Sequence, residues 1–157
     1  MYLKDIIVIN IYNYFNLDKN VTTKIIQIND KNIHLQIWDT SIDPNSNEIY
    51  KVFYPGTKGV FLIYDISNLH SFNNVKNYNK QIDENIPGSF KILIGYNNNN
   101  QNRAIAAEEG KKLANELKID SFFEVSSSGN EKIDEMLNIL SAKKLFGGNE
   151  KDNCLII

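Results

Sequence analysis

The fold class is decided by Val60-Phe61-Leu62-Ile63-Tyr64, a continuous apolar run of the kind found in strands buried on both faces of a parallel sheet. A second buried run, Lys91-Ile92-Leu93-Ile94-Gly95, follows it along the chain. Between the two runs, apolar residues recur every three to four positions from Phe72 to Ile82, which predicts one face of a helix. Strand, helix and strand in this order predict an α/β fold with a largely parallel central sheet.

The flanking sequence extends this alternation in both directions. An apolar run within Lys4–Asn10 predicts a first strand. Two further runs, Thr23 to Ile28 and Ile33 to Trp38, are separated by turn residues and predict an antiparallel hairpin. Beyond the central unit we expect a helix from Ala106 to Leu117, a strand from Ser121 to Val125, and a helix carrying Ile133, Met136, Leu137 and Leu140 on one face, opened by a capping box at Ser128-Gly129-Asn130-Glu131.

Composition excludes several classes of function. The chain has 157 residues, the size of one domain. Its 17 basic and 19 acidic residues give a net charge of −2, so no basic field favours nucleic acid as a partner. Cys154 is the only cysteine in the sequence, which excludes an intramolecular disulfide and a multi-cysteine zinc site.

The sequence carries no pattern of a secretory signal at its start, and no stretch approaches the ~18 apolar residues of a membrane-spanning helix. We therefore expect a soluble, intracellular domain over residues 1–145, followed by a flexible polar tail over residues 146–157.

Ligands of α/β sheets bind beyond the carboxyl ends of the strands, where the strand order reverses. The run Asn97-Asn98-Asn99-Asn100 is typical of a loop at such a position. The candidate site consists of the residues that follow each predicted strand, which are Asn10 and its successors, Asp39 to Pro44, Asp65, Tyr96 to Asn99, and Ser126 to Ser128.

Several of these strand ends match one family of proteins. Ile33-His34-Leu35-Gln36-Ile37-Trp38-Asp39-Thr40 resembles the hairpin strand of Rab-type small GTPases, in which this run leads into the Asp-x-x-Gly motif beside Mg²⁺. From Asp39 to Asp65 the spacing is that of a Rab without insertion or deletion, and the resemblance covers about Ile25 to Leu140. It implies a three-layer, small-GTPase-like α/β fold with a mostly parallel six-stranded sheet and one antiparallel edge strand.

The resemblance also implies a nucleotide site. GTP or GDP with Mg²⁺ would contact the residues that follow three of the strands, with Asp39 as the carboxylate on the Mg²⁺ side. These residues are Asp39, Thr40, Ser41 and Ile42, then Tyr96, Asn97 and Asn99, then Ser126, Ser127 and Ser128.

The sequence departs from the family pattern at each motif that handles the nucleotide. A P-loop reads G-x-x-x-x-G-K-[ST], because glycine amides surround the phosphates and the lysine reaches the β/γ oxygens. The first glycine here is Gly56, so no such loop precedes the hairpin. Ile42 replaces the glycine of Asp-x-x-Gly, and Asp43 stands where the family has its water-positioning glutamine. The base-reading carboxylate is a neutral Asn99, and Asn16 aligns with a threonine that ligates Mg²⁺.

These departures lead us to expect no catalytic residue and lost or weak nucleotide binding, because phosphoryl transfer depends almost wholly on positioning and charge stabilisation. The serine tract likewise lacks the lysine whose stem covers the base in the family.

The family's first helix is missing as well, because only Ile11 to Val21 separate the first strand from the hairpin. In the family's strand order, the first strand lies beside the hairpin's second strand, and the outer strand begins at the same end of the sheet. About ten residues reach roughly 33 Å, more than the ~10 Å of two strand spacings, so the sheet can form without the helix. One face of the sheet then loses a covering helix, which we expect Tyr12, Tyr14, Phe15 and Leu17 to replace in part.

In Rabs, the positions of Val21, Trp38 and Phe53 form an apolar triad that faces effectors, so the resemblance implies effector contact there. The last residues, Cys154-Leu155-Ile156-Ile157, fit the C-a-a-X signal. They predict a prenyl group on Cys154, with geranylgeranyl favoured, attached by a protein prenyltransferase. We then expect the protein at the cytoplasmic face of a cell or vesicle membrane.

Three hypotheses remain open. The first is a degenerate Rab-like protein, prenylated and membrane-associated, that acts in vesicle trafficking through contacts with effectors and does not hydrolyse GTP. The second is a GTPase that keeps nucleotide binding through Asp39, Asn97, Asn99 and the serine tract. The third is a Rab gene product that lacks a coding segment between Ile9 and Lys19, which sequencing of the mature transcript would decide.

Overall fold

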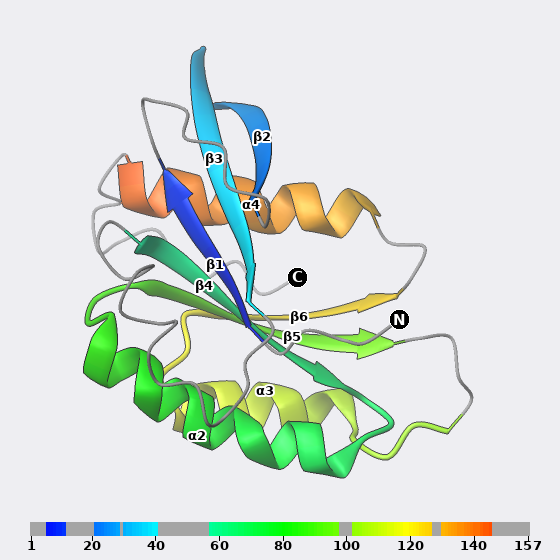
Figure 1. The fold of residues 1–157 in the computed structure, drawn as a ribbon. Coiled ribbons are helices and arrows are strands. Elements are labelled where there is room, and N and C mark those ends of the chain that lie inside the picture. Colours follow the sequence, from blue (N-terminus) through cyan, green and yellow to red (C-terminus); the bar gives the residue numbers. More distant parts are fainter. Residues whose placement is uncertain are drawn as a thin grey trace.

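The computed structural model describes residues 6–11, 21–28, 30–40, 57–97, 102–126 and 130–145. Within these ranges the chain forms a six-stranded sheet with helices on both faces (Figure 1). The strands are β1 (Ile6–Ile11), β2 (Val21–Ile28), β3 (Lys31–Thr40), β4 (Thr57–Asp65), β5 (Phe90–Asn97) and β6 (Ser121–Ser126). The helices are α2 (Leu69–Asn85), α3 (Ala107–Glu116) and α4 (Asn130–Leu145).

The strand order is β2-β3-β1-β4-β5-β6. The predicted hairpin is confirmed, since β2 pairs antiparallel with β3 from Val21 opposite Trp38 to Ile28 opposite Lys31. The predicted alternation of parallel strands and helices is confirmed too, because β4, β5 and β6 run parallel, and α2 and α3 connect them along the chain. β1 lies beside β3, as the family's strand order requires.

The direction of β1 differs from the prediction of a single antiparallel edge strand. β1 runs antiparallel to both neighbours, with Ile6 opposite Thr40 on β3 and opposite Leu62 on β4. Two strands, β1 and β2, therefore oppose the direction of the other four.

The short connection between β1 and β2 explains why this reversal is possible. Ile11 lies opposite Leu35 and Val21 lies opposite Trp38, so the two ends of the connection flank β3 only three positions apart. The separation is about 10 Å along the strand and about 10 Å across it. Residues 12–20 can span about 30 Å and need no crossover helix, which a parallel neighbour would require.

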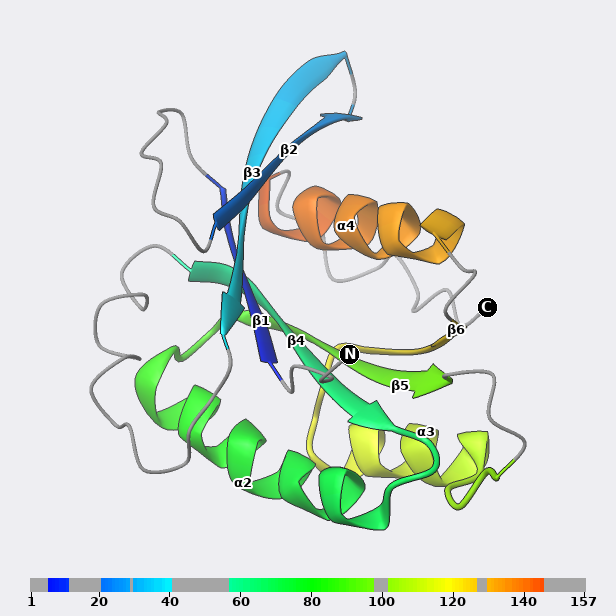
Figure 2. The same cartoon turned by 45° about the vertical axis from the view of Figure 1, so that its right-hand side comes forward.

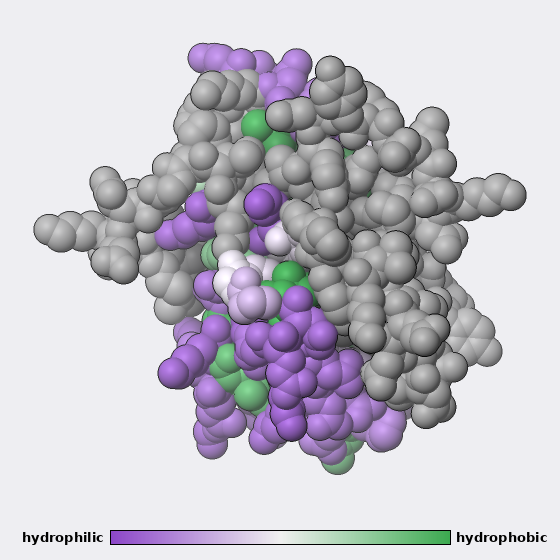
Figure 3. Space-filling model, turned by 60° about the vertical axis from the view of Figure 1, so that its left-hand side comes forward, coloured by the Kyte–Doolittle hydropathy of each residue, from purple (hydrophilic) through white to green (hydrophobic). Residues whose placement is uncertain are grey.

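The two faces of the sheet carry different helices, as Figures 1 and 2 show: α2 and α3 cover one face, and α4 covers the other. On α2 the predicted periodicity is confirmed, with Val75, Tyr78 and Ile82 buried. Asn68 begins this helix by accepting hydrogen bonds from the amides of His70 and Ser71. In the lower part of Figure 3, where the α2 layer lies, the described surface is mostly hydrophilic.

On α4 the predicted apolar face is confirmed for Met136, Leu137 and Leu140, whereas Ile133 is 42% exposed. The predicted capping box before this helix lies mostly outside the described residues. The same holds for Tyr12, Tyr14, Phe15 and Leu17, which the sequence analysis placed over the sheet.

Two apolar cores result, one on each face of the sheet. Side chains of β4 and β5 that face α2 and α3 include Val60, Leu62 and Leu93, and those that face α4 include Phe61 and Ile92. These strands are therefore buried on both faces, as their continuous apolar runs predict. No helix in the described ranges is long and apolar enough to cross a lipid bilayer.

Candidate functional site

The candidate site is the edge of the sheet at which β3, β4, β5 and β6 end, with Thr40, Asp65, Asn97 and Ser126 as their last residues. The register places Asp65 opposite Tyr96 and Asn97 opposite Ser126. Three predicted positions, Tyr96, Asn97 and Ser126, are therefore neighbours at this edge. Asp39 and Thr40 end β3. Because β1 and β4 lie between β3 and β5, about 14 Å separates these two residues from Tyr96 and Asn97.

Asp65 builds the turn that follows β4. Its Oδ1 accepts hydrogen bonds from the Ser67 amide at 2.7 Å and from the Ser67 hydroxyl at 2.6 Å. The Asp65 amide donates to Ser71 Oγ at 3.1 Å, and the Ser71 hydroxyl donates to the Asn68 carbonyl at 2.8 Å. The carboxylate therefore has a structural task in shaping the approach to α2.

Backbone hydrogen bonds join the ends of β4 and β5 to the segment that leads into α3. The Ile66 amide donates to the Tyr96 carbonyl at 3.1 Å. The amides of Ala104 and Ile105 both donate to the Ile66 carbonyl at 2.9 Å. Ile66 and Ile105 are 2% and 1% exposed, so these bonds are made in a dry environment where unpaired polar groups would be costly.

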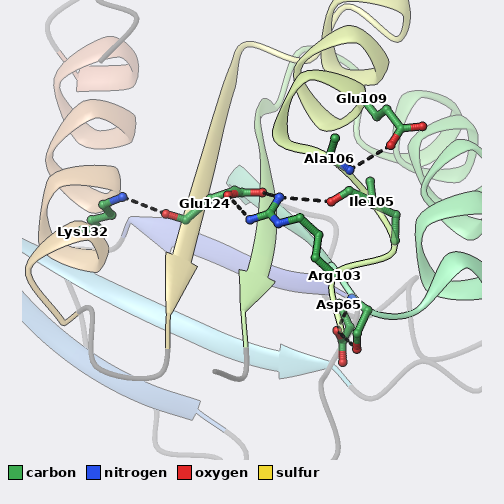
Figure 4. A network of polar contacts seen from close by, with 8 residues as sticks. Asp65, Arg103, Ile105, Ala106, Glu109, Glu124 and Lys132 are labelled. Carbon is green, nitrogen blue, oxygen red and sulfur yellow. Dashed lines mark hydrogen bonds and ion pairs between the residues drawn. The ribbon is translucent and has the colours of Figure 1, made fainter. Parts of the chain in front are cut away.

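Arg103, the chain's only arginine, extends this network to β6 (Figure 4). Its two guanidinium nitrogens Nη1 and Nη2 donate to the two carboxylate oxygens of Glu124, at 2.8 and 2.9 Å, and Nη1 also donates to the Ile105 carbonyl at 3.1 Å. The hydrogen bond to Glu124 raises the pKa of the Arg103 guanidinium, which therefore stays charged. The Lys132 ammonium donates to the Glu124 carbonyl at 2.9 Å, which ties the start of α4 to β6.

This ion pair is not predictable from the sequence pattern, because its partners lie 21 positions apart and no helical or strand period joins them. The one available signal was the presence of a single arginine beside the Asn-rich loop.

Tyr64 lies beneath the edge with no exposed surface. Its ring packs edge-on against Phe72, with centroids 4.9 Å apart. No side chain or backbone group in the described residues pairs with its hydroxyl, which lies close to the Cα atoms of Gly95 and Gly110. Burial is the main cause that raises the pKa of this hydroxyl, so it remains a neutral phenol.

The direction of β1 decides whether the site can receive phosphates in the way the resemblance implies. β1 begins at the candidate edge, with Ile6 opposite Thr40, and ends at the opposite side of the sheet, with Asn10 opposite Thr57. The segment after β1 therefore leaves from the far side of the sheet. Among the described residues, no three His, Cys, Asp or Glu side chains gather to hold a metal ion.

The remaining predicted residues divide into two groups. Val21 and Trp38 are register partners in the β2–β3 hairpin, so two of the three positions expected to face effectors are neighbours. The others lie outside the described residues, namely Ser41, Ile42, Phe53, Asn99, Ser127, Ser128 and Cys154.

Comparison with known proteins agrees with the strand order and with the spacing of the strand ends. The Ras family model matches residues 7–145, so this chain belongs to the Ras family. Its curated relatives are of the Rab type, which confirms the resemblance seen in the sequence.

Three relatives illustrate how far the similarity extends. The chain is 34% identical to Ras-related protein RABE1e of Arabidopsis thaliana over 116 residues, which are 72% of this chain and 53% of that protein. It is 30% identical to Ras-related protein SEC4 of Saccharomyces cerevisiae over 144 residues, 85% of this chain and 66% of the relative. It is 34% identical to Ras-related protein Rab-13 of Mesocricetus auratus over 134 residues, which are 83% of this chain and again 66% of the relative. The matched part spans between half and two thirds of these relatives.

Proposed function

We propose that this protein is a Rab-like member of the Ras family that acts in vesicle trafficking through protein contacts, with lost or weak guanine-nucleotide binding. The observation that carries the proposal is the direction of β1. A phosphate cradle in this fold must follow a strand that ends at the candidate edge, because backbone amides at that edge surround the phosphates. Here β1 starts at that edge, since Ile6 lies opposite Thr40 and Leu62.

The sequence supports the same proposal independently of the strand direction. Ile42 stands in place of the glycine of Asp-x-x-Gly, and Asp43 in place of the water-positioning glutamine. Asn99 replaces the carboxylate that accepts hydrogen bonds from guanine. A neutral amide at that position is a weaker acceptor than a carboxylate, so selectivity for guanine should fall.

A titration of the purified chain with a fluorescent guanine nucleotide and Mg²⁺ tests the proposal. Fluorescence anisotropy should show no saturable binding up to micromolar protein, whereas an intact Rab measured beside it should saturate. Saturable binding at micromolar concentration or tighter would overturn the loss of nucleotide binding.

One specific observation favours the alternative, a GTPase with divergent motifs. Asn97 and Ser126 are register partners at the ends of β5 and β6, so two residues that the resemblance assigns to the nucleotide lie side by side. The variant Asn97→Ala distinguishes specific nucleotide binding from non-specific binding. If nucleotide binds through this edge, the variant binds it more weakly than the unmodified chain does. If only non-specific binding occurs, the two proteins give the same titration curve.

Effector contact is assigned to the hairpin. Val21 and Trp38 are register partners on adjacent strands, so the two positions lie on the same face of the hairpin. Trp38→Ala should weaken capture of trafficking effectors in a pull-down, whereas Lys58→Ala at an exposed position on β4 should leave it unchanged. Equal capture by the two variants would contradict this assignment.

Membrane attachment through a prenyl group on Cys154 completes the proposal, with a protein prenyltransferase and the cytoplasmic face of a membrane as partners. The signal requires the cysteine to be fourth from the end of the mature chain. A single prenyl chain binds a membrane weakly and reversibly, and the positive charges of Lys143, Lys144 and Lys151 would strengthen this binding. The intact mass of the protein recovered from cells checks the modification directly.

A further inference from the structure

The outer strand β2 lacks the features that keep an edge strand from pairing with another chain. Natural edge strands are protected by proline, bulges, short length or unpaired charges. β2 has eight residues without proline or glycine, and its register with β3 is unbroken from Val21 opposite Trp38 to Ile28 opposite Lys31. It ends the strand order, so within the described part of the chain its outward N–H and C=O groups have no strand partner (Figure 2).

The one charge on β2 does not protect this edge. Lys24 is the only charged residue of the strand, and its ammonium pairs with the carboxylate of Asp134 on α4. Its charge is therefore balanced within the same chain, on the face of the sheet that α4 covers. On the other face Ile25 is 57% exposed, and Thr23 and Gln27 are exposed on either side of it. An uncharged surface with an apolar centre thus borders the open edge.

We propose that β2 pairs with β2 of a second copy of this chain, antiparallel, so that the two sheets become one. The contact involves neither a nucleotide nor a lipid, so it stands apart from the proposed function. A two-fold axis makes such a contact self-complementary, because each patch meets its own copy. The residue on the axis lies opposite itself, and residues at equal distances on either side of it lie opposite one another.

The sequence of β2 selects the register of this pairing. Opposing residues of antiparallel strands share a face, so the axis passes through a residue and not between two. An axis at Lys24 pairs residues 21–27, an axis at Ile25 pairs residues 22–28, and every other axis pairs fewer. The first places two lysines directly opposite each other, which is destabilising. The second places Ile25 opposite its own copy and Thr23 opposite Gln27 of the second copy, so the charge favours the axis at Ile25.

Sedimentation velocity on the full, unlipidated chain tests the pairing. The mass should rise with concentration from that of one chain toward that of two. Ile25→Lys places two ammonium groups at the axis and should raise the dissociation constant of the dimer by about tenfold. The control Leu69→Lys changes an apolar residue of similar exposure, 59%, on α2 and should leave association unchanged.

A mixture of two charged variants separates this symmetric contact from a loss of folding. Ile25→Lys and Ile25→Glu should each associate weakly alone. Their equimolar mixture should associate more strongly than either, because opposite charges then meet at the axis. Recovery in the mixture also shows that both variants are folded.

Cross-linking in a Cys154→Ser background checks the register. Ile25→Cys should form a disulfide-linked dimer on mild oxidation, because opposing Cα atoms lie about 4.5–5.5 Å apart. Gln27→Cys lies four positions, about 13 Å, from its own copy and should form none unless it is mixed with Thr23→Cys. Cross-linking as ready at residue 27 alone as at residue 25 would overturn the register. A chain that stays monomeric at every concentration, or that responds equally to Ile25→Lys and Leu69→Lys, would overturn the pairing; the monomer would leave this edge for a strand of a different protein.

Discussion

Replacing Gly59 by alanine should loosen the packing of α4 on the sheet. Gly59 lies in β4, paired with Ile9 on one side and with Phe90 on the other. A Cβ atom at this position would overlap Leu140 Cδ1 and lie 2.7 Å from its Cγ. Leu140 has no exposed surface and packs among Met136 and Leu137, so its side chain has no free space into which it can turn.

The size of the effect follows from two opposing contributions. Overpacking of a well-packed core costs about 1–3 kcal/mol. Alanine restricts the unfolded chain more than glycine does, which returns about 0.4–1 kcal/mol. The middle of the two ranges gives a loss of about 1.3 kcal/mol in the free energy of unfolding for Gly59→Ala, with an upper limit of about 2.6 kcal/mol. Each kcal/mol corresponds to about 2–4 °C in Tm in a chain of this size.

Urea denaturation followed by far-UV circular dichroism measures this loss, and a second substitution tests its cause. Leu140→Ala alone should cost about 2–5 kcal/mol, because it leaves a cavity under α4. In the double variant the new methyl group at residue 59 occupies part of that cavity, so the double variant should be more stable than the sum of the single effects predicts. The reasoning is refuted if Gly59→Ala is as stable as the unmodified chain, or if the two effects simply add.

Three further predictions concern other parts of the molecule. Lys91→Met should cost about 1–3 kcal/mol in urea denaturation, because Lys91 is buried and its ammonium donates to Asn79 Oδ1 at 2.9 Å and to Asp83 at 2.6 Å. The control Lys80→Met, which removes an exposed ion pair on α2, should change stability by less than about 0.5 kcal/mol. Equal losses of stability in the two variants would contradict this prediction. The raised pKa of Tyr64 means that the folded state holds this proton more tightly than the unfolded state, so the stabilisation is complete below about pH 10 and is lost as the pH rises further. Tyr64→Phe should therefore lose less stability than the unmodified chain between about pH 9 and pH 11, and parallel pH profiles would refute the assignment. Cys154→Ser should move the protein from membranes to the soluble fraction of lysed cells, and an unchanged distribution would argue against a lipid anchor.

The fold could be predicted from local sequence patterns wherever packing is decided by neighbours in the chain. Buried runs gave β4 and β5, and the spacing of apolar residues gave the inner faces of α2 and α4. Ile133 shows where this pattern reaches its limit: it has the spacing of the inner face, yet it lies in the first turn of α4 and is 42% exposed.

The direction of β1 could not be predicted in the same way. Its apolar run is equally compatible with both directions, because the side chains of a strand alternate between faces whichever way the strand runs. The family's strand direction depends on a helical crossover, and a short connection removes that constraint. The Arg103–Glu124 pair escaped prediction for a related reason, since it joins two elements through their tertiary placement.

We propose that this Ras-family chain folds and persists without a guanine nucleotide. The most direct measurement is the nucleotide content of the protein purified from cells in the presence of Mg²⁺, obtained by denaturing it and quantifying the released purines by chromatography. We expect guanine nucleotide far below one molecule per protein molecule. A stoichiometric amount of GDP or GTP would contradict it.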